Sequence, residues 1–336
     1  MSSGKMTMAA ALNQALHHAM AADDKVICIG EDIVGGAGIE GAPPGGGVFG
    51  VTQGLAETYG LSRIIDTPIS ETAFVGMAVG SAMTGLKPVV EIMFNDFIGV
   101  CFDQILNQAA KARFLSNGRM NLPLVIRTTM GAGDGSGAMH SASLHGLLAS
   151  VAGLTVACPS TPADAAGMLK TALKSNGTTV MMEHKQLYGT LGDVDPLLPE
   201  VPFGKARTVV EGSDITVVAV AAMAVEAELA AGLLAQSSIS AEVIDPRTVK
   251  PLDVASIVAS VRKTGRLLVV DEGAAFAGFA DAVISVVTEQ AFGSLATAPR
   301  KLCPPDTPVP YAPGAESIWL PTSADIVKAV QDMMEV

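Results

Sequence analysis

The chain has 336 residues, of which 49% are hydrophobic and 16% charged, which is ample material for about two domains with buried sheets. Its net charge of -12 argues against nucleic acid as a partner, since phosphate binding needs clustered lysines and arginines, and no such cluster occurs. The N-terminus lacks the basic start and apolar core of a signal peptide, and no run approaches the ~18 apolar residues of a spanning helix. We therefore expect a cytoplasmic α/β protein that does not bind membranes.

Two further features of the composition bear on compartment and partners. The four cysteines are scattered, with no pair at metal-ligand spacing, and are expected to be reduced core residues. A chain this apolar could hide part of its surface against partner subunits, although a large core alone would explain the same composition.

In chain order, residues 8–22 have helical spacing, and residues 26–29 form a short apolar strand that ends just before Glu31. Catalytic groups of open α/β sheets gather at the carboxyl ends of strands, so Glu31 is a candidate site residue; a solvated loop acid is the alternative. The segment 35–50 is too rich in glycine and proline for regular structure. Its position after a strand favours an active-site or interface loop over a flexible linker.

The stretch DTPISE, from Asp66 to Glu71, places a carboxylate where a strand ends and a helix begins. Pro68 stops the strand, Ser70 can cap the helix through its hydroxyl, and Glu71 falls in the first turn, where the helix dipole favours an ionised carboxylate. An acid in that position is often ordinary helix chemistry. Here almost no polar side chain follows for several turns, so Glu71 would lie at the mouth of an apolar interior and is a candidate for proton transfer.

The next stretch predicts a buried strand over residues 88–93, with Phe97 at its end, and an amphipathic helix over residues 102–114. An aromatic residue at a strand end is usually part of the core. Residues 122–127 predict another strand, which opens into the glycine-rich run 131–137.

Two histidines follow that run, in HSASLH. The spacing of His140 and His145 is too wide for one shared metal on a helix, and one of the two is expected to be structural. His140 follows the glycine-rich loop and precedes an expected helix over residues 143–150, so its imidazole can reach the mouth of an active site.

The rest of the chain continues the strand-and-helix alternation. Residues 192–202, with prolines at short intervals, indicate a linker between domains. We expect a first domain over residues 1–190, a linker over 191–205 and a second, smaller domain over 206–336. The second domain contains no cluster of catalytic residue types and is expected to dimerise and to contact a partner. Its elements are expected as strands at 215–220, 241–244 and 267–271, and helices at 225–235, 253–261 and 279–291.

Three of these motifs together point to a known family. DTPISE, the run from Glu91 to Phe114 and the pair His140-Ser141 resemble the β subunit of thiamine-diphosphate-dependent 2-oxo acid dehydrogenase first components, and the resemblance runs nearly end to end. MFNDFIG, residues 93–99, is most similar to the acetoin dehydrogenase branch. The resemblance implies two three-layer α/β domains with mainly parallel sheets, a transketolase-like pyrimidine-binding domain and a transketolase C-terminal-like domain.

The same resemblance implies roles for particular residues. In the family, thiamine diphosphate lies between an α subunit, which holds the diphosphate and magnesium, and the β subunit, which holds the aminopyrimidine. Glu71 would hydrogen-bond the pyrimidine ring nitrogen as an acid and base, and His140 would lie near the substrate and the incoming lipoyl group. The matching pocket-lining residues are Glu31, Ser70, Met93 and Phe97, of which Phe97 would stack on the aminopyrimidine.

The resemblance further implies a structural potassium ion bound largely by backbone carbonyls. Ser175 stands where relatives often have an acid, which puts this site in question. The matching positions are Leu124, Ala172, Leu173, Ser175 and Gly177.

The chain also departs from the family of thiamine enzymes in informative ways. Their diphosphate motif pairs Gly-Asp-Gly with a downstream Asn-Asn, which this sequence lacks, so Asp134 is not expected to hold a metal and another chain must complete the site. Met139 stands where relatives commonly have glutamine, and residues 134–138 lack a common arginine. The substrate is therefore hypothesised to be more apolar than pyruvate or acetoin.

The leading interpretation is an oxidoreductase subunit, active only with an α subunit in an α2β2 heterotetramer, that cleaves acetoin or a related acyloin or diketone and passes the acyl unit to a lipoyl-bearing acyltransferase. One alternative is the β subunit of a pyruvate or branched-chain 2-oxo acid dehydrogenase. Another is a non-catalytic assembly subunit whose acidic site has decayed.

Overall fold

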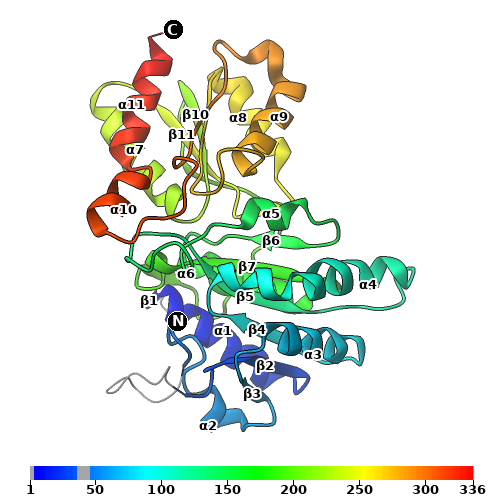
Figure 1. Ribbon diagram of the computed structural model, residues 1–336. Helices are drawn as coiled ribbons and strands as arrows, with labels where there is room; N and C mark the ends of the chain where they lie inside the picture. The colour runs from blue at the N-terminus through cyan, green and yellow to red at the C-terminus, as the bar shows by residue number, and fades with distance from the viewer. Residues whose placement is uncertain (1–3, 36–45, 336) are drawn as a thin grey trace. The chain divides into compact units, whose positions relative to one another are not determined.

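The computed structural model describes residues 4–35 and 46–335, and the chain divides into two compact units (Figure 1). The first unit comprises residues 1–130 and 150–202, and the second comprises residues 131–149 and 203–336. The glycine-rich run with His140 therefore groups with the C-terminal part of the chain. The domain limits expected from the sequence, at residues 190 and 206, stay predictions.

The first unit is built on a parallel sheet with the strand order β6-β7-β5-β4-β2-β3. Its strands are apolar runs, because helices cover both faces of a parallel sheet. A separate antiparallel pair joins β1 (Gly4–Thr7) to β8 (Leu191–Val194), so part of the expected linker is a strand. The strands of the parallel sheet are β2 (Val26–Glu31), β3 (Ile64–Thr67), β4 (Lys87–Ile92), β5 (Val125–Met130), β6 (Thr155–Ala157) and β7 (Thr179–His184).

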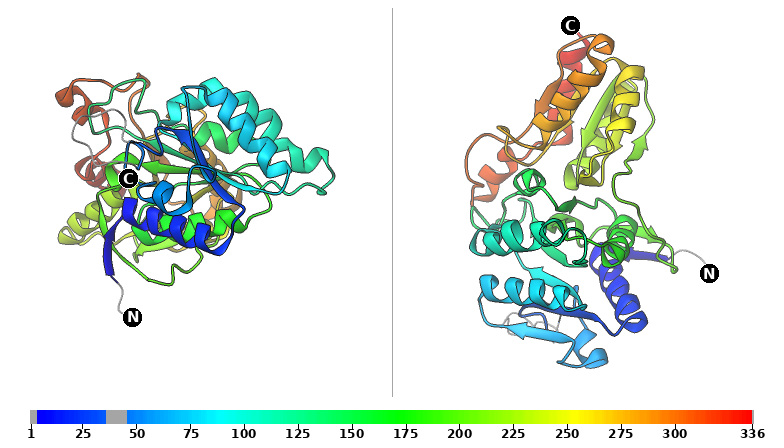
Figure 2. Two further views of the ribbon diagram at one scale, coloured as in Figure 1. Left: turned by 90° about the horizontal axis from the view of Figure 1, so that it is seen from below. Right: turned by 90° about the vertical axis from the view of Figure 1, so that its right-hand side faces the viewer.

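Helices pack on both faces of this sheet. Figure 2 shows α1 on one face and α3 with α4 on the other, and α6 packs against α1. Two of these helices begin with capping threonines: the hydroxyl of Thr7 accepts from the amide of Ala10, and that of Thr161 from the amide of Asp164. The helices of this unit are α1 (Met8–Ala22), α2 (Leu55–Tyr59), α3 (Glu71–Met83), α4 (Ala110–Leu115) and α6 (Pro162–Lys174).

The amphipathic helix expected over residues 102–114 is not regular. The chain instead forms a 3₁₀ helix (Asn95–Cys101), a π-helical stretch (Gln104–Ala109) and then α4. A π-helical stretch changes the phase of the side chains relative to a continuous α-helix, and such stretches are frequent at functional sites. The apolar periodicity predicted helical backbone correctly but could not distinguish these geometries.

The second unit has a sheet with the order β14-β13-β10-β11-β9, in which only β9 is antiparallel to its neighbour. Figure 1 shows β10 and β11 between α7 and α11 on one side and α8 and α9 on the other. Its elements are α5 (His145–Ser150), β9 (Arg207–Val210), β10 (Ile215–Ala219), α7 (Ala222–Gln236), β11 (Ala241–Asp245), β12 (Thr248–Lys250), α8 (Val254–Thr264), β13 (Leu267–Val270), α9 (Phe279–Ala291), β14 (Arg300–Leu302), α10 (Pro313–Trp319) and α11 (Ser323–Met334), with short 3₁₀ helices at Lys185–Leu187 in the first unit and Phe292–Ser294 in this one.

The α/β alternation expected for this region is confirmed, with element ends displaced by a few residues. The caps explain where two of its helices begin: Asp253 accepts from the amide of Ser256 at the start of α8, and Thr322 with Asp325 forms a capping box at the start of α11. Along residues 4–35 and 46–335, no helix is long and apolar enough to span a bilayer.

Candidate active site

A cavity of about 720 Å³ lies in the first unit where β2 and β4 end and α3 begins. All five residues predicted to bind the cofactor border it. This is the place where an open α/β sheet gathers functional groups, because the carboxyl ends of its parallel strands meet at one edge. The lining residues are Glu31, Ile69, Ser70, Glu71, Thr72, Ala73, Met93, Phe97 and Val100.

Glu71 is the first residue of α3 and is only 6% exposed. Among the described residues, none donates a hydrogen bond to its carboxylate, so a buried acid at the cavity wall has its oxygens free for a ligand. The start of the helix favours negative charge there. The neighbouring hydroxyl does not cap the helix, contrary to expectation: Ser70 donates to the carbonyl oxygen of Pro68 at 2.9 Å.

Glu31 lies at the end of β2, on the same cavity. Burial raises the pKa of its carboxyl, and the negative charges of Asp32, Glu71 and Asp66 raise it further. Of the two interpretations for Glu31, the position at the cavity favours a site residue over a solvated loop acid.

A buried cysteine, Cys101, lies close enough to Glu71 to be affected by its charge. Burial raises the pKa of the Cys101 thiol to about 12, and the negative charge of Glu71 contributes. Cys101 therefore remains an uncharged thiol, as expected for a core cysteine. None of the four cysteines, all of which lie among the described residues, forms a disulfide; Cys28, Cys101 and Cys158 are buried, as expected for core residues, whereas Cys303 is half-buried.

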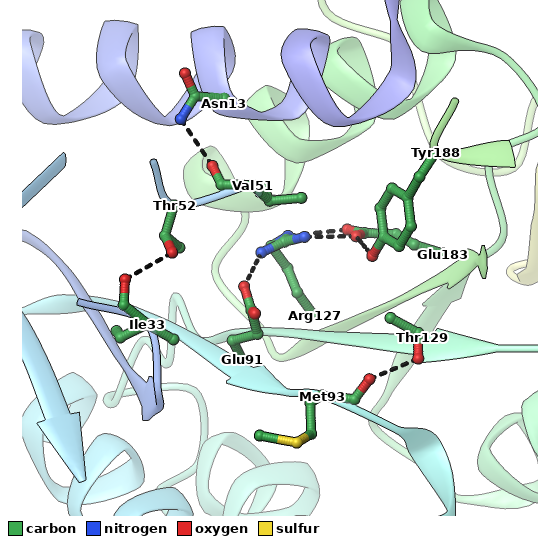
Figure 3. A network of polar contacts seen from close by, with 10 residues as sticks. All are labelled: Asn13, Ile33, Val51, Thr52, Glu91, Met93, Arg127, Thr129, Glu183 and Tyr188. Carbon is green, nitrogen blue, oxygen red and sulfur yellow. Dashed lines mark hydrogen bonds and ion pairs between the residues drawn. The ribbon is translucent and has the colours of Figure 1, made fainter. Parts of the chain in front are cut away.

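The opposite wall of the cavity is aromatic and apolar. The ring of Phe97 packs edge to face on Phe94 with centroids 5.7 Å apart, and its amide donates to the Phe94 carbonyl at 3.0 Å. The carbonyl of Met93 accepts from the hydroxyl of Thr129 at 2.5 Å. Figure 3 shows this bond, which ties the residue after β4 to the end of β5. Phe97 is thus a half-buried cavity residue, rather than the core residue its position alone would suggest.

Sequence reasoning missed a buried ionic network beside this wall (Figure 3). Arg127 donates to both oxygens of Glu183, at 2.9 and 2.6 Å, and to Glu91 at 2.6 Å. The hydroxyl of Tyr188 donates to Glu183 at 2.7 Å. The sequence held a signal for this network, because each of the three charged residues directly follows an apolar run within a strand: PVVEIM, VIRTT and VMMEH. Charges in buried strands are rarely tolerated unless they are paired.

The end of the glycine-rich insert packs on this network. Gly47 has a φ of 67°, and a Cβ there would lie 2.7 Å from the Glu91 carboxylate, so a side chain at that position would be strained and would displace Glu91. Figure 3 also shows Thr52 donating to the carbonyl of Ile33 at 2.8 Å, which ties the insert to the chain after β2. Residues 36–45 of the expected active-site or interface loop lie outside the described residues.

His140 belongs to the second unit. Its amide donates to the carbonyl of Gly137 at 3.2 Å, inside a loop that closes where the amide of Gly131 donates to Ala142 at 3.2 Å. Met139 beside it is 71% exposed.

His145 is the structural member of the pair. Its Nε2 lies 2.8 Å from Asp271 in a fully buried pair. Burial works against a charged imidazole, but the Asp271 carboxylate raises the pKa of His145 above its usual value. Asp271 follows β13 directly and is itself fully buried.

The five positions implied for potassium lie around the end of α6 and the start of β7. Three of their carbonyls accept from protein donors, among them Leu124 from the amide of Thr179 at 2.9 Å and Ala172 from the amide of Ser175 at 3.0 Å. The Ser175 hydroxyl donates to the carbonyl of Gly177 at 2.7 Å. Together with Leu173, these positions stay a predicted cation site. In the described part of the chain, no cluster of three histidine, cysteine or acidic side chains could hold a metal.

Two family models match the chain. Residues 4–190 match the transketolase pyrimidine-binding domain and residues 204–326 match the transketolase C-terminal domain. The cavity and Glu71 fall in the first match, and so does the glycine-rich run with His140.

Similar proteins cover nearly the whole chain. The acetoin:2,6-dichlorophenolindophenol oxidoreductase subunit beta of Cupriavidus necator is 44% identical, over 98% of each chain, and that of Bacillus subtilis is 41% identical, over 98% of this chain and 97% of that one. The pyruvate dehydrogenase E1 component subunit beta of Rickettsia conorii is 39% identical over 97% of this chain and 98% of its own. Among solved structures, a split-gene transketolase, described as an inactive beta4 tetramer, has the same fold, with a TM-score of 0.78, 23% identity and coverage of 97% of this chain and 98% of its own.

Proposed function

The chain belongs to the family of β subunits of thiamine-diphosphate-dependent 2-oxo acid and acetoin dehydrogenases, and from this premise we propose that it supplies the aminopyrimidine half of the active site in an acetoin-cleaving enzyme. The single observation that carries the proposal is the cavity beside Glu71. Its wall combines a buried carboxylate that no described group engages with a half-buried aromatic ring, Phe97.

These residues fit the cofactor's aminopyrimidine. A flat heteroaromatic ring needs an apolar surface to stack on and a partner for its ring nitrogen. Phe97 and Met93 offer the first, and the Glu71 carboxylate offers the second. Ser70 and Glu31 border the same space.

The chemistry divides between cofactor and protein. Thiamine diphosphate, when bound, supplies the carbon nucleophile that attacks a carbonyl. Glu71 would hold a proton at the pyrimidine ring nitrogen and return it, which is general acid-base work. Glu31 would border the bound ring from the end of β2. His140 would stabilise charge or transfer a proton near the substrate and the incoming lipoyl group.

The remaining parts of the enzyme come from elsewhere. Because the sequence has no Asn-Asn to pair with Gly-Asp-Gly, magnesium and the diphosphate would be held by an α subunit in an α2β2 heterotetramer. Transfer of the acyl unit to a lipoyl-bearing acyltransferase, potassium at residues 124 and 172–177, and a cytoplasmic location stay predictions.

We expect this chain alone to bind no thiamine diphosphate and the chain with an α-type subunit to bind it. The physical reason is that half of the contacts, those to the charged diphosphate and its magnesium, are missing from the lone chain. Isothermal titration calorimetry in the presence of magnesium, on the chain alone and after co-expression with an α-type subunit, measures this. Binding by the lone chain would refute the half-site assignment, and binding by neither sample would refute the proposed function.

The substrate is proposed to be acetoin or a related acyloin or diketone. The acetoin-enzyme relatives at 44% and 41% identity support this, while the pyruvate dehydrogenase relative at 39% keeps pyruvate or a branched-chain 2-oxo acid as the second candidate. The exposed thioether of Met139, one residue before His140, favours an apolar substrate.

Replacing Met139 by glutamine is expected to shift the preference toward smaller and more polar substrates. A glutamine amide would offer a donor and an acceptor where the thioether offers apolar surface, and one such change is worth about 1–3 kcal/mol of discrimination. The measurement is kcat/KM of the assembled enzyme for acetoin, pyruvate and bulkier diketones. An unchanged order of preference in Met139→Gln would count against a role for this residue.

A further inference from the structure

The glycine loop, which we define as residues 131–137 (GAGDGSG), is bound by carboxylates of its own chain. The amide of Ala132 donates to Glu272 Oε1 at 2.6 Å. The amides of Gly133 and Gly135 donate to the two oxygens of Glu316, at 2.7 and 2.9 Å. The carboxylates therefore occupy the place that a phosphate takes in an anion-binding loop.

The glycines make this arrangement possible. Gly131, Gly133, Gly135 and Gly137 have φ of 95°, 108°, 73° and 72°, a region that side chains disfavour. Successive amides can then converge on one anion. A Cβ on Gly137 would also lie 3.3 Å from the Tyr311 ring. As in a phosphate cradle, backbone amides of the loop point at an anion, but here the anion is a carboxylate of the same chain.

Both carboxylates are held firmly in the second unit. Glu272 is 6% exposed and follows β13, and Glu316 is 3% exposed and lies in α10. A buried carboxylate that accepts charge-assisted hydrogen bonds from two amides fixes both its own helix and the loop it binds. Removing such a partner leaves the part-buried amides of Gly133 and Gly135 without their protein acceptor.

The loop in turn carries His140. The amide of His140 donates to the carbonyl of Gly137, the last residue of the glycine loop, and Gly131 at its first residue pairs with Ala142. We propose that Glu316, assisted by Glu272, is a positioning residue that sets the place of the His140 imidazole through the glycine loop. The proposal rests on the proposed function for the part that His140 plays in catalysis.

Glu316→Gln is the sharpest test. An amide side chain keeps the size of glutamate but can accept from only one of the two loop amides and presents N–H₂ to the other. Glu226→Gln is the matched control, since Glu226 accepts from the amide of Ser323 at 2.7 Å in the same unit without contacting the loop. Glu316→Asp, which keeps the charge, is the conservative variant.

The readouts are amide hydrogen exchange over residues 131–144 in the full chain, and kcat and KM of the complex with an α-type subunit. In Glu316→Gln we expect faster exchange confined to this segment, and a fall in kcat of about ten- to hundredfold with thiamine diphosphate binding retained, because a displacement of about 1 Å can cost that much. Glu316→Asp should recover part of both effects, and Glu226→Gln should change neither.

The outcomes distinguish failure of the positioning role of Glu316 from failure of the proposed function. Unchanged exchange in the glycine loop of Glu316→Gln overturns the positioning proposal whatever the activity does. Faster exchange with unchanged kcat overturns the proposal that Glu316 positions His140 through the glycine loop and leaves the proposed function standing. Loss of cofactor binding in Glu316→Gln also counts against the proposal, because Glu316 would then act beyond the loop it binds.

Discussion

Replacing Glu71 by glutamine is expected to lower turnover of the assembled enzyme by about 10²- to 10⁴-fold. Glutamine has nearly the same shape and can still hydrogen-bond a ring nitrogen, but its amide cannot act as an acid or a base there. The buried position of Glu71 at the start of α3 leaves no other described acid on the same turn of helix to take over. Steady-state kinetics with acetoin and with 2-oxo acids measures the change.

Two comparisons make the Glu71 result specific. Glu57→Gln alters an exposed acid in the first turn of α2 and is expected to leave activity unchanged. Size-exclusion chromatography should show that Glu71→Gln still assembles with an α-type subunit as the wild-type chain does. Full activity in Glu71→Gln would remove Glu71 from the mechanism. If the wild-type complex is as inactive as the variant, the non-catalytic assembly subunit becomes the better interpretation.

Replacing Arg127 by methionine is expected to destabilise the chain by about 3–5 kcal/mol. Arg127 is 2% exposed and pairs with both Glu91 and Glu183, so its removal leaves two carboxylates in the core without a counter-charge. Burial already raises the pKa of Glu91 even though Arg127 opposes that shift. Urea unfolding followed by circular dichroism measures the loss of stability.

The pH dependence of that loss follows from linkage. A carboxyl whose pKa is raised by folding holds its proton more tightly in the folded state, so stability falls as the pH rises through the raised pKa. Without Arg127 this effect grows, and the loss in Arg127→Met should be larger at about pH 8 than at about pH 5. The control is Lys174→Met, which breaks an exposed pair with Glu200 and should cost less than about 1 kcal/mol. Equal losses in the two variants would refute the importance of the network.

The buried network also bears on the site itself. Glu91 and Arg127 lie on neighbouring strands, β4 and β5, whose ends carry Met93 and Thr129. Destabilising the strands would loosen the hydrogen bond between those two residues at the cavity wall. Partly restored stability in the double variant Arg127→Met with Glu183→Gln would show that the uncompensated charge, rather than the lost volume, dominates.

The sequence by itself determined the elements and the family. Apolar runs predicted α1, β2 and α9 nearly to the residue, because local periodicity and caps decide where such elements begin and end. An apolar strand, the motif DTPISE and an apolar helix follow one another in the sequence. This order predicted that Glu71 lies at a helix start without any tertiary information. The five cofactor-pocket residues were named by the resemblance to the family; of these, Glu31 and Glu71 were also candidates because they lie at strand ends, which meet at one edge of a parallel sheet.

Only the tertiary structure decided what lies between those motifs. It showed that the Ser70 hydroxyl does not cap α3, and that the helix expected over residues 102–114 contains a π-helical stretch at Gln104–Ala109. It paired charges far apart in the sequence, Arg127 with Glu183, and it supplied Glu316 as the anion of the glycine loop. Patterns along the chain encode local backbone preference. The partner of a buried charged side chain, or of a backbone amide in a loop, depends instead on how distant segments pack together.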